Sequence, residues 1–515
     1  MRTDRRWAAA LALTAFGFFG LTTGAERPWG DGHIQYRLAE QLWTAGRVDL
    51  PEAWSRYAFP GPDGRHYSTF SLGVALSLGP SVLATRVLAP DEHPRPLWAL
   101  AHRTANGLWA ALTLALFFLL ARTLAVPRRR ALGGAVVLGV ATQLWVYAHS
   151  DFSEAYQAFA LLLAVFTAVR AVHGAGRGRD VALGLAWGHL LIAKVVYLAV
   201  APLGLWYVWR GLRGDPRRLR RLALAVAVSL PFVAAFFGYN LVRTGEWLGT
   251  GRQMDHFAHP MAGSLLVGLY GLLLSTGKGV LFFDPALLLS LAGARPFARQ
   301  WPAEARFVGL LAGALLLIYA KYVFWHGAWS YGPRFLTCLM PLAVLPLLWR
   351  PPAPTRARRW AVGAVLAVSV GVQALGCAIY EGHHIHANTR LRRAVYGEGP
   401  RDTCAWCHEN HWLAHFVPHA SPIAVHAWAV KHALLRSPPA TRAADAPWAW
   451  ALPPRLAAQV EPIAPPTDFV LRRREAGHPK GLAALGLALL CLLAGAGWLR
   501  RQWGREGRSE GGGDA

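Results

Sequence analysis

Asp31 is the acidic residue whose surroundings best suit chemistry. It lies in Trp29-Gly-Asp-Gly-His-Ile-Gln-Tyr36, eight residues after an apolar run at residues 7–23. The two flanking glycines leave the carboxylate accessible, and the apolar run places it where a membrane would meet water. Such a carboxylate suits a general base, which takes a proton from an attacking group. The alternative is that Asp31 caps the next helix, a common role of aspartate.

A second acidic pair could act with Asp31. Asp151 and Glu154 lie in His149-Ser-Asp-Phe-Ser-Glu154, directly before another apolar run. They could support the base, or they could cap the helix that follows. With Asp31 they could also ligate a divalent metal, Mg²⁺ or Mn²⁺, because such ions prefer carboxylate oxygens. Other candidates for the same cleft are Tyr36, Tyr67 and His149.

Four basic residues lie near predicted ends or breaks of apolar runs, namely Lys194, Lys278, Lys321 and Arg334. A lysine within an apolar stretch, such as Lys194, is costly and therefore points to function. Lys194, Lys278 and Arg334 are the candidates for binding a phosphate at headgroup depth, since lysine and arginine are the usual phosphate ligands. Alternatively, Lys278 marks an exposed helix break, and Arg334 and Lys321 are interfacial anchors.

Membrane-spanning helices must position these residues. The chain has 515 residues, of which 54% are hydrophobic and 16% charged, and the apolar residues form long runs. About 20 apolar residues cross a hydrocarbon core of about 30 Å, where the backbone must be helical. The predicted spans are 7–23, 99–121, 131–148, 155–173, 219–240, 307–325, 335–349, 360–380 and 481–499. The first is predicted to be an anchor rather than a cleaved signal peptide.

The net charge of +25 is an orientation signal rather than a sign of nucleic-acid binding. Arginines cluster between the apolar runs, as the positive-inside rule predicts for cytoplasmic loops. The clusters are Arg2/5/6, Arg122/128/129/130, Arg177/179, Arg210 to Arg221, Arg295/299/306, Arg350/356/358/359 and Arg500/501/505/508. Keeping them all on one side requires a helical hairpin in 181–209 that turns near Lys194. It also requires a single crossing within 263–293 and a juxtamembrane helix at 70–88.

The predicted fold is therefore an all-α polytopic bundle of about 12 transmembrane helices, with both termini cytoplasmic. Residues 1–380 form the transmembrane catalytic module, in which 24–98 is the first outer loop with juxtamembrane helices. Residues 381–480 form a small outer-face region rich in histidine and proline. Residues 481–515 form the last transmembrane helix and a basic cytoplasmic tail.

The outer-face region contains Asp402-Thr-Cys-Ala-Trp-Cys-His408. A disulfide between Cys404 and Cys407 would suit an oxidising outer compartment. The same residues match the Cys-x-x-Cys-His pattern of a c-type haem site. A zinc site with His408 and His411 is the third alternative. The sequence favours the disulfide, because the haem pattern stands without further support.

Several stretches together resemble the GT-C glycosyltransferases, which include protein O-mannosyltransferases and aminoarabinose transferases. They are the acidic loop at Asp31, the Tyr-x-x-Phe-x-x-Gly pattern at Tyr67–Gly73, Thr142–Glu154, Tyr270–Pro285 and Trp329–Leu336. Their order and spacing carry the resemblance, which covers roughly residues 7 to 350. The chain departs from the aminoarabinose-transferase pattern at Ser68-Thr-Phe70, where Lys-Pro-Pro would stand.

The resemblance implies an inverting transfer of a hexose or pentose from a polyprenyl-phosphate donor at the outer face of a bacterial inner membrane. The acceptor would be a lipid, a polysaccharide or a protein. Asp31 would be the base, Asp151 and Glu154 would support it, and the cations would hold the donor phosphate. A lipid transporter or flippase is the main alternative, but internal repeats are absent from the sequence and the acids cluster at one surface. A membrane redox protein would depend on the haem pattern at Cys404–His408 alone.

Overall fold

The computed structural model describes residues 2–23, 31–52, 58–88, 95–249, 259–327, 330–352, 355–382, 384–385, 388, 408–438, 441, 446–447 and 479–510. Cys404 and Cys407 lie outside these residues, so the disulfide, haem and zinc alternatives stay predictions. The regular secondary structure of the described chain is helical apart from three two-residue strands. The predicted all-α character is therefore confirmed.

The described elements follow one another along the chain in this order. The first half contains α1 (Arg2–Leu21), α2 (Asp31–Ala45), β1 (Asp49–Leu50), β2 (Phe59–Pro60), β3 (His66–Tyr67), α3 (Leu72–Ser77), α4 (Gly79–Leu88), α5 (Arg95–Thr123), α6 (Arg128–Val140), α7 (Leu144–His149), α8 (Glu154–Val172), α9 (Arg177–Ala193), α10 (Val196–Gly211) and α11 (Arg218–Thr244). The second half contains α12 (Leu265–Leu274), α13 (Val280–Phe283), α14 (Leu287–Gln300), α15 (Pro302–Lys321), η2 (Arg334–Leu339), α16 (Met340–Val344), η3 (Leu345–Trp349), α17 (Arg356–Ala378), α19 (His408–Phe416), η4 (Pro418–Ala420), α20 (Pro422–Leu435) and α23 (Pro479–Glu510).

Five helices are long and apolar enough to cross a membrane, among the residues that the structure describes. They are Thr104–Thr123 of α5, α8, α11, α15 and α17. Shorter apolar segments occur at α12 and at Arg334–Trp349. The predicted number of about 12 spans is thus not confirmed, whereas the apolar, multi-helix character is.

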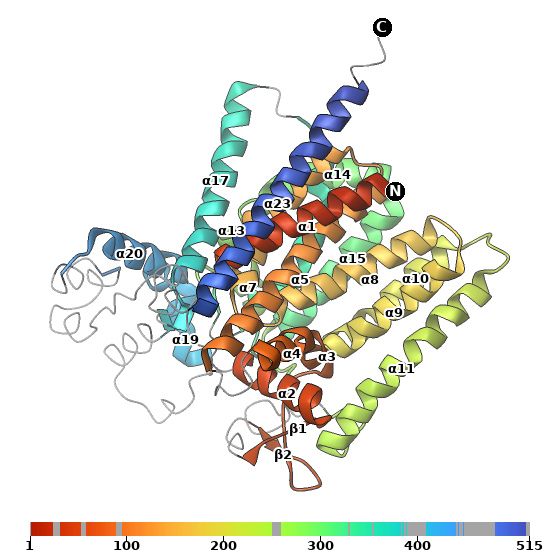
Figure 1. Cartoon of the computed structure of the whole chain (residues 1–515), viewed down its shortest axis with the longest axis horizontal. Coiled ribbons are helices and arrows are strands. Elements are labelled where there is room, and N and C mark those ends of the chain that lie inside the picture. The colour runs from red at the N-terminus through yellow and green to blue at the C-terminus, as the bar shows by residue number, and fades with distance from the viewer. Residues whose placement is uncertain are drawn as a thin grey trace.

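The first and last helices pack against each other in opposite directions (Figure 1). The rings of Trp7 and Trp503 lie 6.1 Å apart, near the start of α1 and toward the end of α23. Farther along α1, a Cβ at Gly17 would overlap the backbone of Leu492. Glycine therefore permits the close approach of the two helices. The antiparallel arrangement brings the start of α1 and the end of α23 to the same end of the bundle.

The arginine clusters gather at this end, which we call the basic end. Asp4 accepts hydrogen bonds from Arg122 at 3.0 Å and from Arg128 at 2.9 Å. Other contacts join the remaining clusters, namely Arg129 over Trp503, Arg130 with the carbonyl of Leu348, Trp349 with Gln300, His173 with Glu304, and Arg221 with the carbonyl of Gly174. These contacts bring segments that lie far apart in sequence together at the basic end.

The opposite end of the bundle holds the acidic candidates. His173 directly follows α8 and contacts Glu304 at the basic end, whereas Glu154 begins α8. The 19 residues of α8 separate the two ends by about 28 Å. Helices α2, α3 and α4 and the small sheet lie at the Glu154 end (Figure 1). We call this the site end.

The predicted hairpin turns at Lys194. Helix α9 ends at Ala193, Lys194 is extended with φ −164°, and α10 begins at Val196. A Cβ at Gly204 of α10 would overlap the ring of Trp187 of α9, so the two helices pack closely side by side. The hairpin is confirmed, and its turn lies at the site end because α9 begins with the basic cluster.

The first loop folds over the site end as short helices and a three-stranded antiparallel sheet of order β1-β3-β2. Tyr67 of β3 pairs with Asp49 on one side and Phe59 on the other. Segment 70–88 forms α3 and α4 rather than one continuous helix. Both are shorter than a membrane span, which agrees with the predicted juxtamembrane position.

The described helices of the 381–480 region pack on the bundle. The amide of Gly277 donates to the carbonyl of His415 at 3.0 Å, and Phe416 of α19 stacks on Tyr270 of α12. Helix α20 packs on α17, where Trp428 and Ala378 share a buried cluster. These helices therefore belong to the same folded unit as the transmembrane module, although the domain boundary at residue 380 stays a prediction.

Candidate functional site

A cavity of about 270 Å³ opens at the site end. Its walls come from the start of α2, the 69–74 segment, the start of α8, the α9–α10 turn, the end of α11 and the start of η2. Four of the predicted site residues line it, namely Asp31, Glu154, Lys194 and Arg334. These residues lie as much as 303 positions apart in sequence. The fold thus brings four residues from distant segments to one cavity.

Arg334 links the two acids. Its Nη1 donates to Oδ2 of Asp31 at 3.1 Å, and its Nε lies 4.0 Å from Oε1 of Glu154. The guanidinium carbon is 4.6 Å from the ring centre of Phe152 and 5.0 Å from that of Phe335. The side chain of Arg334 is 8% exposed and that of Asp31 29% exposed. A guanidinium held by two acids and two rings is buried with its charge compensated, while Asp31 keeps access to the cavity.

The backbone before Arg334 turns sharply to bring it there. Gly332 has φ +66°, a left-handed conformation that glycine adopts without strain. A Cβ at Gly332 would lie 2.7 Å from the ring of Phe283, so glycine is also needed for space. Pro333 follows and η2 begins at Arg334. The Tyr-Gly-Pro-Arg sequence thus encodes the turn that aims the guanidinium at the cavity.

Glu154 is the first residue of α8, and the loop that precedes it is held by Asn106 of α5. The Asn106 amide donates to the carbonyls of Ser150 at 2.9 Å and Phe152 at 2.6 Å. Glu154 is 4% exposed, and its Oε2 has no hydrogen-bond partner among the described residues. No side-chain cap of α8 is formed by Ser153. A buried carboxylate oxygen without a protein donor is available to a donor group on a ligand.

Asp151 lies behind the start of α2 and does not line the cavity. It is 5% exposed, and a Cβ on Gly32 would come within 2.5 Å of its Oδ2. Gly32 therefore lets α2 approach Asp151 closely. Because Gly32 directly follows Asp31, Asp151 contacts the backbone that carries the candidate base.

Lys194 reaches the cavity from the α9–α10 turn. Its Nζ lies 4.6 Å from the ring centre of Phe335 and 5.3 Å from that of Tyr319. Cation–π contacts of this kind stabilise an ammonium group in an apolar wall. Lys194 and Arg334 thus place two positive charges on the same cavity.

A third cation, Arg243 near the end of α11, was not among the sequence candidates. It is 4% exposed and lines the cavity. Its guanidinium donates to the carbonyls of Ser68 at 2.9 Å and Phe70 at 3.4 Å, and to Oδ1 of Asn240 at 2.8 Å. Arg243 therefore contacts the Ser68-Thr-Phe70 segment through its backbone carbonyls. The signal in the sequence was an arginine on the face that the positive-inside rule leaves poor in arginine.

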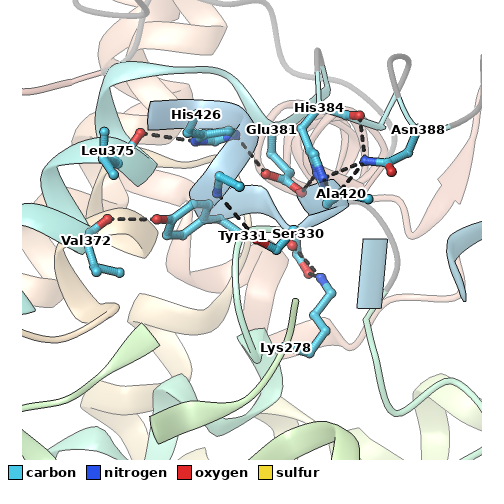
Figure 2. Close-up of polar contacts among 12 residues, drawn as sticks. Lys278, Ser330, Tyr331, Val372, Leu375, Glu381, His384, Asn388, Ala420 and His426 are labelled. Carbon is cyan, nitrogen blue, oxygen red and sulfur yellow. Dashed lines mark hydrogen bonds and ion pairs between the residues drawn. The ribbon is translucent and has the colours of Figure 1, made fainter. Parts of the chain in front are cut away.

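Four other candidates lie away from the cavity. Lys278 is 2% exposed, and its ammonium donates to the carbonyl of Ser330 and, at 2.9 Å, to the hydroxyl of Ser330 (Figure 2). Tyr36 is packed in the core, Tyr67 donates to Asp63 at 2.9 Å, and His149 Nδ1 contacts the carbonyl of Thr22. Lys278 thus contacts the 330–334 segment at Ser330 and does not line the cavity, and its predicted role at the phosphate stays a prediction. Lys321 is exposed and lines no part of the cavity.

The described residues form no complete protein site for the divalent metal, which stays a prediction. Within the ranges that the structure describes, no three His, Cys, Asp or Glu side chains lie close enough to hold an ion. In the cavity, the guanidinium of Arg334 lies where a cation would have to join Asp31 and Glu154. Asp151 faces Gly32 instead. Positive charge between the acids is thus supplied by the protein.

The chain matches no protein-family model and no curated protein sequence. Among solved structures it is similar to ArnT from Cupriavidus metallidurans bound to undecaprenyl phosphate, with a TM-score of 0.47 and 18% identity over 96% of this chain and 77% of that chain. The apo state of the same ArnT matches with a TM-score of 0.46 and 17% identity, over 94% and 75%. The archaeal oligosaccharyltransferase AglB from Archaeoglobus fulgidus, in complex with an inhibitory peptide and a dolichol-phosphate, matches with a TM-score of 0.49 and 11% identity, over 80% and 60%. At these scores and identities the likeness assigns no activity to this chain, which must be inferred from its own residues.

Proposed function

We propose that this protein is an inverting glycosyltransferase that moves one sugar from a polyprenyl-phosphate donor to an acceptor. The observation that carries the proposal is the cavity itself. An acid with access to the cavity, a second acid with an unpartnered oxygen and three cations surround one space at a helix-bundle end. This is the charge pattern that a base, a sugar and a departing phosphate require.

Asp31 acts as the base in the proposed reaction. An acceptor hydroxyl attacks the anomeric carbon while its proton passes to the Asp31 carboxylate. The bond from that carbon to the phosphate oxygen breaks, and polyprenyl phosphate leaves with the bonding electron pair. Attack opposite the leaving group inverts the configuration, as in other single-displacement glycosyl transfers. Glu154, through Oε2, accepts a hydrogen bond from a hydroxyl or amino group of the sugar.

Three cations stabilise the phosphate as it departs. Lys194, Arg334 and Arg243 approach the cavity from the α9–α10 turn, η2 and α11. Positive groups fixed in advance stabilise the developing charge more effectively than water does. Arg243 supplies a positive charge beside Ser68–Phe70, where this chain lacks the lysine of the resembling enzymes. We therefore assign Arg243, in place of Lys278, to the phosphate.

The cavity volume favours a small sugar. Ordinary ligand pockets hold about 300–1,000 Å³. A space of about 270 Å³ suits one monosaccharide with its phosphate rather than an oligosaccharide. The prenyl chain would lie along the apolar part of the wall, which includes Phe236, Tyr239 and Tyr322. A hexose or pentose donor is accordingly part of the proposal.

The basic end is proposed to face the cytoplasm, in line with the positive-inside rule. Both termini would then be cytoplasmic and the cavity would open at the outer face of a bacterial inner membrane. Accessibility of single cysteines to a membrane-impermeant reagent tests this. Labelling from outside at Asp63→Cys and from inside at Asp215→Cys is expected, and the opposite pattern would contradict it.

The experiment that tests the activity uses the purified full chain in phospholipid vesicles. Undecaprenyl-phosphate-linked pentose and hexose serve as donors, and extracted envelope lipids and polysaccharides serve as acceptors. Formation of undecaprenyl phosphate together with a labelled acceptor is expected. Asp31→Asn should reduce transfer at least about 10³-fold without loss of folding. Asp63→Asn, in the same loop but 44% exposed, is the matched control.

Two outcomes would overturn the proposal. Near-normal transfer by Asp31→Asn would remove the base from the mechanism. Movement of labelled donor across the vesicle membrane without sugar transfer would favour a lipid transporter instead. Mass spectrometry of envelope glycans, with and without the gene, identifies the acceptor class in either case.

A further inference from the structure

A buried acid lies between two histidines next to the segment that carries Arg334. Glu381 follows α17, and its Oε1 accepts from Nδ1 of His384 at 2.8 Å. Its Oε2 lies 3.1 Å from Nε2 of His426 on α20. The His384 and His426 side chains are 1% and 0% exposed, and that of Glu381 is 12% exposed. Figure 2 shows the carboxylate between the two rings.

The cluster contacts the 330–334 segment through Tyr331. The ring of Tyr331 stacks on that of His426, with centres 5.0 Å apart and planes inclined by 28°. The Tyr331 hydroxyl donates to the carbonyl of Val372 in α17 at 2.8 Å, and its own carbonyl accepts from Tyr147 at 2.8 Å. Tyr331 is only three residues before Arg334. A shift of its ring would therefore move the turn at Gly332 and, with it, the guanidinium.

The partners of His426 determine its protonation. Nδ1 lies 3.1 Å from the carbonyl of Leu375, which can only accept, so Nδ1 must donate. Nε2 faces an oxygen of Glu381 at 3.1 Å. A lone pair on Nε2 would repel an ionised carboxylate, whereas a proton there would be attracted. The geometry therefore suits the imidazolium form, which has a proton on both nitrogens.

Glu381 is ionised in this arrangement. Burial alone would raise the pKa of its carboxyl, but the contacts with His384 and His426 outweigh burial and hold the pKa well below its ordinary value. The pair Glu381–His426 is thus a carboxylate facing a ring whose other nitrogen already donates. Loss of the Nε2 proton would turn an attraction into a repulsion inside a buried cluster.

We propose that Glu381 and His426 are positioning residues for Arg334, and that protonation of His426 keeps the 330–334 segment in its active position. The proposal rests on the proposed glycosyl transfer. When His426 loses a proton, the Glu381 contact breaks, the ring beneath Tyr331 moves, and Arg334 no longer holds Asp31 and the phosphate in place. Activity then falls on the alkaline side.

Other charged and titratable groups surround His426. Glu381, His384 and Tyr331 from neighbouring elements contact it directly. Lys278 acts on Glu381, and Cys377 and Asp284 act on Tyr331; on α20 itself the charged and titratable residues are Lys431 and His432. The Nε2 of His384 contacts both an acceptor, the carbonyl of Ala420 at 2.9 Å, and the amide of Asn388 at 2.6 Å, so its partners do not determine its protonation. The protonation argument is therefore strongest for His426, and the test is directed at this residue.

The test compares pH profiles of kcat and of the donor KM in vesicles. The wild-type rate should fall about tenfold or more as the medium becomes alkaline, equivalent to about 1.4 kcal/mol. His426→Gln cannot titrate, so its rate should be lower near neutral pH and no longer fall on the alkaline side. Glu381→Gln presents an amide that can donate to an unprotonated Nε2, so it should retain activity at alkaline pH.

His173→Gln is the matched control. His173 also contacts a glutamate, Glu304, at 2.8 Å, but at the basic end. Its variant should keep the wild-type pH profile. Thermal unfolding of each variant distinguishes a displaced Arg334 from a loss of folding. If His426→Gln fails to fold, the pH profile of Glu381→Gln alone tests the inference.

Failure of the inference is distinguishable from failure of the proposed function. Wild-type transfer with identical alkaline profiles in all four proteins would overturn the inference alone. Absence of transfer at every pH would overturn the proposed function. In that case binding of undecaprenyl phosphate, measured over the same pH range, decides the inference, because Arg334 lines the phosphate site. Binding that weakens on the alkaline side only when His426 is present would support it, and equal binding by all variants would overturn it.

Discussion

Replacing Arg334 by glutamine removes the charge that lies between Asp31 and Glu154. The guanidinium is 3.1 Å from one acid and 4.0 Å from the other. At such distances a unit-charge pair near a protein surface interacts by about 4 kcal/mol at an effective dielectric constant of about 20, before the cost of desolvation. The net value of a charged hydrogen bond is smaller, about 1.5–3 kcal/mol. We use the net value, because Asp31 is 29% exposed.

These values give the expected loss of rate. Loss of the contact that holds Asp31, worth about 1.5–3 kcal/mol, corresponds to a decrease of about 10- to 150-fold in the rate of transfer. Loss of one positive group at the departing phosphate costs a further 10²–10³-fold, roughly. Arg334→Gln should therefore transfer sugar about 10³–10⁵-fold more slowly than the wild type. Arg334→Lys, which keeps the charge but cannot form the same fork, should lie between the two.

The assay is the initial rate of transfer in vesicles, read together with thermal unfolding. Arg221→Gln is the matched control, since its side chain is also 8% exposed and is also paired with two acids, Asp180 and Asp215, but at the basic end. Breaking either buried pair should lower stability by about 3–5 kcal/mol. Only Arg334→Gln should lower the rate of the folded protein.

A double-mutant cycle can refute the reasoning. If Arg334 works partly through Asp31, the Asp31 part of its loss is already present in Asp31→Asn, so the double variant should lose about 10- to 150-fold less than the product of the two single losses. Losses that multiply fully would show that the two residues act independently. An Arg334→Gln enzyme with a normal rate would contradict the assignment directly.

Three further predictions follow from other contacts. Lys194→Met should raise the donor KM about 10- to 100-fold, because the ammonium charge is lost. Folding should be little affected, because methionine can still pack on the rings of Phe335 and Tyr319. An unchanged KM would remove Lys194 from the phosphate site. Gly32→Ala should lower the rate of transfer by about tenfold or more, because its Cβ would lie 2.5 Å from Oδ2 of Asp151 and displace the start of α2. Gly133→Ala is the control, because its Cβ would meet nothing within 4 Å, and it should leave transfer unchanged. Glu381 contributes stability above the ordinary carboxyl pKa of 4.5 that is lost as the pH falls below this value, because its pKa is lowered in the fold. Melting temperatures from pH 7 downward should therefore fall less steeply for Glu381→Gln, and parallel curves would contradict the ion pair.

Much of the site could be predicted from local features of the sequence. Asp31 between two glycines, Glu154 before an apolar run, Lys194 within one and Arg334 at the end of another were each conspicuous in isolation. The arginine clusters predict how these four residues lie relative to one another, because they assign every span a direction and so place all four at one end. Hydrophobic length and charge position are local properties, and this part of the fold depends on them.

Other site features depend on contacts that no local pattern encodes. Arg243 lies near the end of an ordinary-looking apolar helix, and only the packing of α11 against Ser68 and Phe70 brings it to the cavity. Lys278, like Lys194, is a lysine at a break between apolar helices, yet its side chain contacts Ser330 and does not line the cavity. Which way a side chain points at a helix break is decided by the neighbouring helices.

Apolar run length and charge position suffice to predict a helical membrane protein with its candidate acids at one end and its arginine clusters at the other, because both are local properties of the chain. Helix packing, in contrast, places Arg334 between Asp31 and Glu154, Asp151 beside Gly32, and Glu381 between His384 and His426. These relations link residues far apart in the chain. They arise from helix packing, whose close approaches depend on the shapes of both surfaces at once.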